Sequence, residues 1–432
     1  MSDMNDLLQK IEYITAEDLD RAWLNFELDL PLKMEPGGPP NPFYVDRPGN
    51  PVAELEQALL APFYRLPKYF FSGHRGCGKS TELRRLEVNP QIRAKYIPFH
   101  FTIRDEADIN SLDYRDVLLA IGGQMYLQYR EEGGRLPKQL LSERDQFRGR
   151  IEKEIVIAPR VSEMGVEGQL DTFFAKAGLK LKLEPRVRTV VRRVIEEDIT
   201  GLIELLRVIS ISIRNATGRW PLVLIDDLDK PDLARAREIF YEHREVMLQP
   251  DIAIVYTVSS PLFYSPEFEA IRDRAIFLPN VKLHPQGRPE ERDAEGYRTM
   301  RMFAHKRMHP DLIADGALNE AIRLSGGVFR EMCRVMRYAI GRARRRGARR
   351  IELEDVHLAG AEIRNEYRRI LTADQRRLLA EVHAHNRLDR PEAIGPLMQT
   401  LAALEYRNGE NWCDVHPALL PLLEEGQGAI NP

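Results

Sequence analysis

Cysteine is scarce in this sequence: three of 432 residues, Cys77, Cys333 and Cys413, and they stand far apart. That spacing excludes a metal cluster built on paired cysteines and gives no disulfide framework, so we expect a reducing compartment. Long apolar runs are missing as well. No stretch approaches the roughly 20 apolar residues that cross a bilayer, and the N-terminus lacks the apolar core of a signal peptide. These absences predict a cytoplasmic protein with no membrane contact.

An excess of charge of one sign is also missing, since the formal net charge is -3 at pH 7. This balance argues against a protein that binds polyanions over its whole surface, although it leaves local basic patches open. The length is sufficient for two or three domains with buried cores.

The most specific feature is a glycine-rich loop followed by Thr81; it reads Gly73-His74-Arg75-Gly76-Cys77-Gly78-Lys79-Ser80. It fits G-x-x-x-x-G-K-[ST], the phosphate-binding loop of P-loop nucleotidases. A short strand over 69–71 is predicted before it and a helix over 81–86 after it. In that setting, backbone N–H groups and the helix N-terminus bind a β-phosphate. Lys79 then reaches the β- and γ-phosphates, and Ser80 holds Mg²⁺. The alternative is a glycine-rich turn that matches by chance.

An acidic motif ends the strand predicted over 222–225, where four apolar residues precede Asp226 and Asp227. This is the Walker B pattern. Asp226 is expected to hold Mg²⁺, and Asp227 to orient or deprotonate the attacking water. Aspartate is shorter than the glutamate found here in many motor ATPases, so we expect slow hydrolysis. Acids also end strands without any function, which is the alternative.

The strand predicted over 252–260 should end beside the phosphate loop, because ligands bind at the carboxyl edge of open α/β sheets. A polar side chain there is expected to touch the γ-phosphate or the water. Ser259 is the first candidate, followed by Thr257 and Ser260.

The chain divides by composition into four parts. The predicted parts are an N-terminal arm (1–42), a P-loop α/β core with a parallel sheet (43–285), a helical lid (286–370) and a winged-helix-like domain (371–432). The arm contains a proline- and glycine-rich stretch over 36–40 and is expected to build little core. At the start of the core, the candidates for packing on adenine are Tyr44, Val45 and Arg47, with plain core packing equally open.

A charged insertion is predicted inside the core at about 131–200. It alternates apolar and basic residues over 173–183, and it carries an arginine cluster formed by Arg186, Arg188, Arg192 and Arg193. The pattern is typical of a solvated helical face; a nucleic-acid or membrane contact is the alternative.

The last part reads as two helices, 373–383 and 394–404, followed by a hairpin over 405–415 that turns at Asn408-Gly409. Its would-be recognition helix, 394–401, contains no arginine or lysine. A DNA reader needs such side chains, so we expect a structural or protein-contact wing.

A dense basic run precedes this part. It comprises Arg334, Arg337, Arg342, Arg344, Arg345, Arg346, Arg349 and Arg350. Either nucleic-acid contact or a solvated helix end explains it.

The order of these parts resembles the AAA+/STAND group of P-loop ATPases over about residues 43–425. The phosphate loop is the most specific match. The segment 225–229 is similar to the acidic strand end of STAND and KAP-type members, and Ser325-Gly326-Gly327 with Arg330 is similar to the sensor-2 segment of AAA+ proteins, including origin-recognition ATPases. The resemblance implies sensor 1 at Ser259, sensor 2 at Arg330, and an arginine finger for a neighbouring subunit at Arg272 or Arg274.

The resemblance further implies ATP and Mg²⁺ as ligands and a switch that hydrolyses ATP slowly. Such a switch would form homo-oligomers and control a separately encoded effector or partner protein, for example in bacterial phage defence. Two alternatives stay open: a DNA-associated loader or initiator that uses the basic run and the wing, and a nucleotide-binding scaffold without hydrolysis.

Overall fold

The computed structural model describes residues 12–134, 185–387 and 390–428, and within these the chain forms two compact units. We call Ala53–Ser72 with Glu82–Phe277 the sheet unit. The helical unit comprises Met1–Val52, Gly73–Thr81 and Leu278–Pro432.

Five strands form the sheet in the order β2-β3-β4-β1-β5. Their bounds are β1 Lys68–Gly73, β2 Tyr96–Thr102, β3 Trp220–Asp226, β4 Ala253–Thr257 and β5 Ala275–Leu278. The ladders β2–β3, β3–β4 and β1–β4 are parallel, and this confirms the predicted P-loop α/β sheet. Pro98 lies in β2 at the edge of the sheet, where a residue without an N–H is tolerated.

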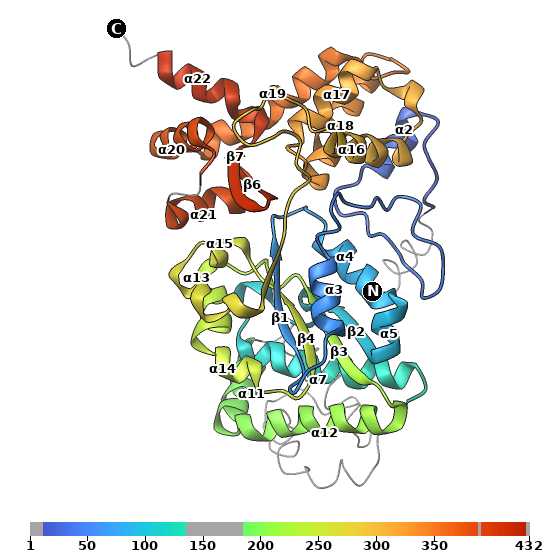
Figure 1. Cartoon of the computed structure of the whole chain (residues 1–432), viewed down its shortest axis with the longest axis vertical. Coiled ribbons are helices and arrows are strands. Elements are labelled where there is room, and N and C mark those ends of the chain that lie inside the picture. The colour runs from blue at the N-terminus through green and yellow to red at the C-terminus, as the bar shows by residue number, and fades with distance from the viewer. Residues whose placement is uncertain (1–11, 135–184, 388–389, 429–432) are drawn as a thin grey trace. The chain divides into compact units, whose positions relative to one another are not determined.

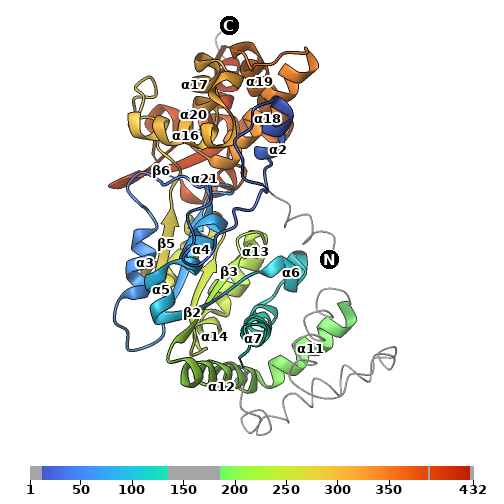
Figure 2. The same ribbon diagram turned by 90° about the vertical axis from the view of Figure 1, so that its right-hand side faces the viewer.

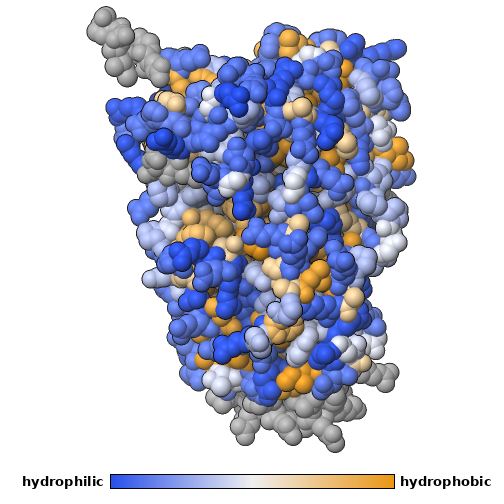
Figure 3. All heavy atoms as spheres, in the orientation of Figure 1, coloured by the Kyte–Doolittle hydropathy of each residue, from blue (hydrophilic) through white to orange (hydrophobic). Residues whose placement is uncertain are grey.

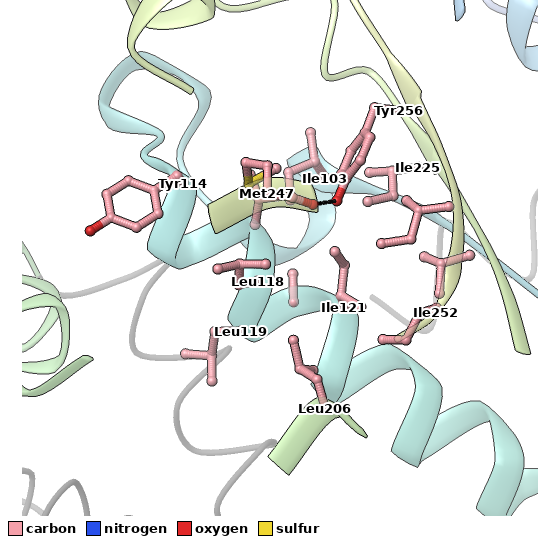
Figure 4. Close-up of a cluster of buried hydrophobic side chains, with 14 of the residues drawn as sticks. Ile103, Tyr114, Leu118, Leu119, Ile121, Leu206, Ile225, Met247, Ile252 and Tyr256 are labelled. Carbon is pink, nitrogen blue, oxygen red and sulfur yellow. Dashed lines mark hydrogen bonds between the residues drawn. The ribbon is translucent and has the colours of Figure 1, made fainter. Parts of the chain in front are cut away.

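Helices cover both faces of the sheet, as Figure 2 shows with α3 and α5 on one side and α7 on the other. The longer helices of this unit are α3 Ala53–Leu60, α4 Lys79–Val88, α5 Pro90–Lys95, α7 Tyr114–Glu131, α11 Pro185–Glu197 and α12 Ile199–Thr217. The shorter helical segments are α6 Ile103–Glu106, α13 Leu233–Arg237, α14 Arg244–Leu248, α15 Ser260–Phe263 and η4 Arg272–Arg274. Buried side chains from α7, α12 and the central strands form one core (Figure 4), in which the Tyr256 hydroxyl donates to the Met247 carbonyl at 2.8 Å.

The described end of the predicted insertion belongs to this core. Helix α11 buries Val191 and Ile195. Arg192 forms an ion pair with Asp116, and Arg188 forms one with Asp108 at 3.3 Å. The expectation of a solvated face, or of a nucleic-acid or membrane contact, is therefore wrong for these two arginines. The stretch 173–183 lies outside the described residues.

The helical unit contains the lid and the C-terminal module (Figure 1). The lid helices are α16 Ala294–Arg307, α17 Asp315–Leu324, α18 Phe329–Arg345 and α19 Leu353–Ile370. The C-terminal module consists of α20 Ala373–His385, α21 Pro391–Gln399, β6 Ala403–Asn408, β7 Glu410–Val415 and α22 Leu420–Gly428. Strands β6 and β7 pair antiparallel around Gly409, whose φ is 95°. The predicted helix–helix–hairpin pattern of a winged-helix-like fold is confirmed.

The N-terminal arm, by contrast, is built into the lid. Its helix α2, Leu19–Asn25, packs on α18, and Phe26 directly after it is completely buried. The amide of Asn25 donates to the carbonyl of Arg307 at 2.7 Å. The proline- and glycine-rich stretch 36–40, on which the expectation of little core rests, is exposed, whereas the helix before it contributes to the core.

The same arm pairs with two arginines of the basic run, Arg337 and Arg344, and with Arg330 before it. Arg330, Arg337 and Arg344 stand seven residues apart and thus share one face of α18. Their acidic partners in the arm are Asp29, Glu27 and Asp20, and Trp23 stacks against two of these guanidinium groups. Further pairs join Arg334 to Glu366, Arg342 to Glu362 and Arg346 to Asp355. Most arginines of the run thus pair with carboxylates of the helical unit.

The surface of the protein is mainly hydrophilic. Hydrophilic side chains predominate on the face shown in Figure 3, with apolar ones scattered among them. Among the described helices, none combines the length and the hydropathy that a membrane crossing requires.

Replacing Phe26 by alanine tests the docking of the arm. Removing a fully buried phenylalanine should lower the free energy of unfolding by about 3–5 kcal/mol. The matched control is Leu24→Ala, two residues away, whose side chain is 58% exposed and whose loss should cost at most about 0.5 kcal/mol. Urea denaturation measures both; equal stability of the two variants would contradict a docked arm.

Candidate functional site

Three glycines give the phosphate loop its course. Gly73, Gly76 and Gly78 have φ values of 156°, 79° and 107°, which L-residues with side chains rarely adopt. Space forbids a side chain as well. A Cβ on Gly73 would lie 2.7 Å from the Leu278 carbonyl oxygen, and one on Gly76 would lie 2.2 Å from Cβ of Arg330. The pattern read from the sequence thus corresponds to a backbone that only glycine can form.

Lys79 begins helix α4 and lies over the loop. Its ammonium donates to the carbonyls of Gly73 at 2.7 Å and His74 at 3.1 Å, and the residue is buried. Ser80 and Thr81 follow in the first turn of the helix, where backbone N–H groups have no helical partner. Positive charge and free N–H donors are what a phosphate needs.

Two arginines of the helical unit border the loop. The backbone N–H of Arg330 donates to the carbonyl of Gly76 at 3.2 Å, while its guanidinium binds Asp29 at 2.6 Å. Arg47 lies near Gly78, with Nη2 3.1 Å from where a Cβ on that glycine would be. Its other nitrogen donates to the carbonyl of Pro279 at 2.8 Å. The structure therefore places Arg47, considered for adenine packing, beside the phosphate loop.

The side chains of the other loop residues serve different purposes. Arg75 is exposed, and Cys77 is buried against Gly73 as filler. His74 is completely buried and turned into the C-terminal module, where burial lowers its pKa to about 4. Of the other two adenine candidates, Val45 is buried and the carbonyl of Tyr44 accepts from Lys306 at 2.6 Å. Their contact with adenine stays a prediction.

The acidic end of β3 has an unusual backbone. Asp226 is buried and accepts the N–H of Asp227 at 2.9 Å, and Asp227 adopts φ 64°. The Asp227 carboxylate pairs with Nε of Arg104 at 3.1 Å and Nζ of Lys230 at 3.6 Å. Burial nevertheless raises the pKa of Asp227. A non-glycine residue in the left-handed region and a desolvated carboxylate are both costly, which is typical of a functional position.

Sequence reasoning missed Arg104. It lies two residues after the end of β2, and the pairing of Thr102 with Asp226 brings this strand end beside the acids. Nothing local in the sequence marks the residue, because its role depends on which strand neighbours β3.

The three hydroxyl candidates lie at the end of β4 or just after it, and all three are buried; Ser260 begins helix α15. Thr257 ties the strand ends together, since its hydroxyl accepts from the N–H of Leu228 and donates to the carbonyl of Ile225, both at 2.9 Å. Ser259 is 3% exposed, and its Oγ makes no hydrogen bond to any described residue. Leaving a buried hydroxyl unpaired costs about 1–3 kcal/mol, so Ser259 is the candidate that a ligand would satisfy.

The two arginine-finger candidates lie on η4, before β5. Arg272 is 58% exposed at its side chain and pairs with Glu269 at 2.9 Å, and Arg274 is exposed as well. An exposed position is required of a group offered to another subunit; its use as a finger stays a prediction.

These donors fit a nucleotide with Mg²⁺. Among the described residues no group of three or more metal-ligating side chains could hold an ion. Nucleotide-bound Mg²⁺ does not need such a cage, because it takes one or two protein oxygens together with phosphates and water.

Replacing Asp227 by asparagine should stabilise the fold. Asparagine tolerates the left-handed conformation and carries no charge to desolvate, so the free energy of unfolding at pH 7 should rise, on the order of 1 kcal/mol. Because the folded-state pKa of Asp227 is raised, the gain should be full above that pKa and vanish below about pH 4, where wild type is protonated in both states. Denaturation at pH 7 and pH 3.5 measures this; a destabilised variant at pH 7 would contradict it. Asp227→Ala, which is uncharged but strained at this φ, is the control.

The chain matches no family model, and no curated protein is similar to it in sequence. Among solved structures it is similar to Cdc6p from Pyrobaculum aerophilum, with 11% identity, a TM-score of 0.43 and coverage of 95% of this chain and 99% of that one. The Aeropyrum pernix ORC1 protein in complex with DNA shows 15% identity, a TM-score of 0.42 and coverage of 93% and 96%. Drosophila ORC bound to DNA shows 12% identity, a TM-score of 0.40 and coverage of 96% and 85%. At such TM-scores the similarity gives this chain no function.

Proposed function

We propose that the chain is an AAA+-type P-loop ATPase that acts as a slow, nucleotide-controlled switch. The phosphate loop is the observation that supports this most strongly, because its three glycines have positive φ and its lysine lies over the loop. A glycine-rich turn that matched the pattern by chance would have no need of a buried lysine directed at its own carbonyls.

In this proposal each residue contributes one element of phosphate chemistry. Loop N–H groups and Lys79 bind the phosphates, and Arg330 and Arg47 lie beside Gly76 and Gly78 of the loop. Ser80 and Asp226 are the Mg²⁺ ligands by the motif. Bound Mg²⁺ supplies charge neutralisation at the phosphates.

The acidic strand end and the serine after β4 would handle the attacking water. Asp227 orients it or accepts its proton, and the hydroxyl of Ser259 donates to it or to the γ-phosphate. Arg104 and Lys230 restrain the short Asp227 side chain through ion pairs. A restrained, short base supports slow turnover rather than the rapid cycling of a motor.

When nucleotide is bound, copies of the chain would assemble with one another and control a partner protein. Exposed Arg272 or Arg274 is available to a neighbouring copy as a finger, and a separately encoded effector, for example in phage defence, would respond to the assembled state. A DNA-associated role loses its main support from the basic run, because most of those arginines pair with carboxylates of the same unit.

Lys79→Ala is the direct test of nucleotide binding. Losing the ammonium removes charge-assisted bonds worth about 1.5–3 kcal/mol each, so affinity for a fluorescent ATP analogue with Mg²⁺ should fall about 100-fold or more. Arg75→Ala is the matched control, since it removes a cation from the same loop but from an exposed position; its affinity should change less than about threefold. Unchanged binding by Lys79→Ala would overturn the proposed function.

A further inference from the structure

One side chain of the phosphate loop is anchored in the C-terminal module. Nε2 of His74 accepts the backbone N–H of Glu405 at 2.8 Å, and Nδ1 lies 3.3 Å from the carbonyl oxygen of Met398. A backbone N–H can only donate, so Nε2 carries no proton. The ring is therefore neutral, with its proton on Nδ1, which donates to Met398. Both ring nitrogens of a fully buried histidine are used to bridge α21 and β6.

The backbone of the same residue binds the phosphate-binding lysine. The carbonyl of His74 accepts from Nζ of Lys79 at 3.1 Å and from the N–H of Cys77 at 3.1 Å. Two of the three ammonium protons of Lys79 bind the carbonyls of Gly73 and His74, and a phosphate that takes the third draws the ammonium away from these carbonyls by its charge. A movement of the His74 peptide also moves its ring, and this changes the hydrogen bonds of the ring to Met398 and Glu405 in the module.

The two residues that His74 binds, Met398 and Glu405, lie on either side of a short turn. Residues 400–402 join α21 to β6, and Leu401 within them has φ 63°, a conformation that is strained for leucine. Leu401 and Leu404 pack in one buried cluster with Val328 of the sensor-2-like segment. The hydroxyl of Tyr406 donates to the carbonyl of Gly326 at 2.8 Å. A strained turn that is held at both ends is a suitable element for a two-state change.

We propose that His74 is a positioning residue that couples phosphate binding in the loop to the C-terminal module: nucleotide draws Lys79 and the His74 peptide apart and thereby weakens the hydrogen bonds to Met398 and Glu405. This rests on the proposed nucleotide binding. Coupling between two sites is reciprocal, so breaking the anchor also tightens the binding of nucleotide. Nucleotide binding in the loop would thus change how firmly the C-terminal module is held.

Hydrogen exchange at the amide of Glu405 in the full chain tests the coupling without relying on turnover. A non-hydrolysable ATP analogue with Mg²⁺ should accelerate exchange over 402–406 at least about fivefold in wild type, within the usual range of coupling energies. Bound analogue without any change in exchange would overturn the coupling and leave the proposed function intact. If no analogue binds wild type, the proposed function fails and the coupling fails with it.

Two variants sharpen the result. In His74→Ala, exchange at Glu405 should be fast without nucleotide and unaffected by it, and affinity for the analogue should rise about fivefold or more. Tyr406→Phe is the matched control, because it removes a hydrogen bond of the same length between the module and Gly326 but leaves His74 bound. It should keep the nucleotide response. Weaker binding by His74→Ala would show a merely structural role and overturn the proposal; should that variant not fold, the wild-type measurement decides.

Discussion

The hydrogen bond from the backbone N–H of Arg330 to the carbonyl of Gly76 joins the phosphate loop to the lid of the helical unit. It requires a glycine, because a Cβ at position 76 would overlap the lid helix. The first turn of α18 therefore lies directly on the phosphate loop. Farther along the same helix, Arg337 and Arg344 hold the N-terminal arm. One close approach of two backbones thus connects the loop, the lid and the arm.

Charge is used in two different ways in the two units. In the helical unit most cations of α18 are neutralised by carboxylates nearby, which favours a stable scaffold over a free polyanion-binding face. At the end of β3, by contrast, burial raises the pKa of Asp227 even though Arg104 and Lys230 are close. Structural ion pairs stabilise the first arrangement, whereas the second keeps a costly carboxylate and a strained backbone where chemistry is expected.

Much of the fold was predictable from the sequence because its signals are local. The apolar run of β3, the glycine pattern after β1 and the Asn408-Gly409 turn each act over a few residues, and the structure has all three. The docking of the arm was not predictable, since Asn25 binds the carbonyl of Arg307, 282 residues away. No local pattern shows such a contact.

The candidate site divides in the same way. The motif residues Lys79, Asp226 and Asp227 follow from spacing, and their chemical roles stay predictions. Arg104 and the anchoring of His74 depend on which strand neighbours β3 and on which segment meets the loop. The sequence also does not tell Ser259 from Thr257. In the described structure the Thr257 hydroxyl bonds the backbones of Leu228 and Ile225, whereas the Ser259 hydroxyl bonds no described residue.

The central claim is that nucleotide in the phosphate loop changes the state of the protein. Light scattering after size exclusion, without nucleotide and with a non-hydrolysable ATP analogue and Mg²⁺, tests it most directly. We expect the particle mass of wild type to grow with the analogue and the mass of Lys79→Ala to stay unchanged. A wild-type particle of unchanged mass at saturating analogue would contradict an assembling switch and would exclude a finger supplied by Arg272 or Arg274 to a neighbouring copy.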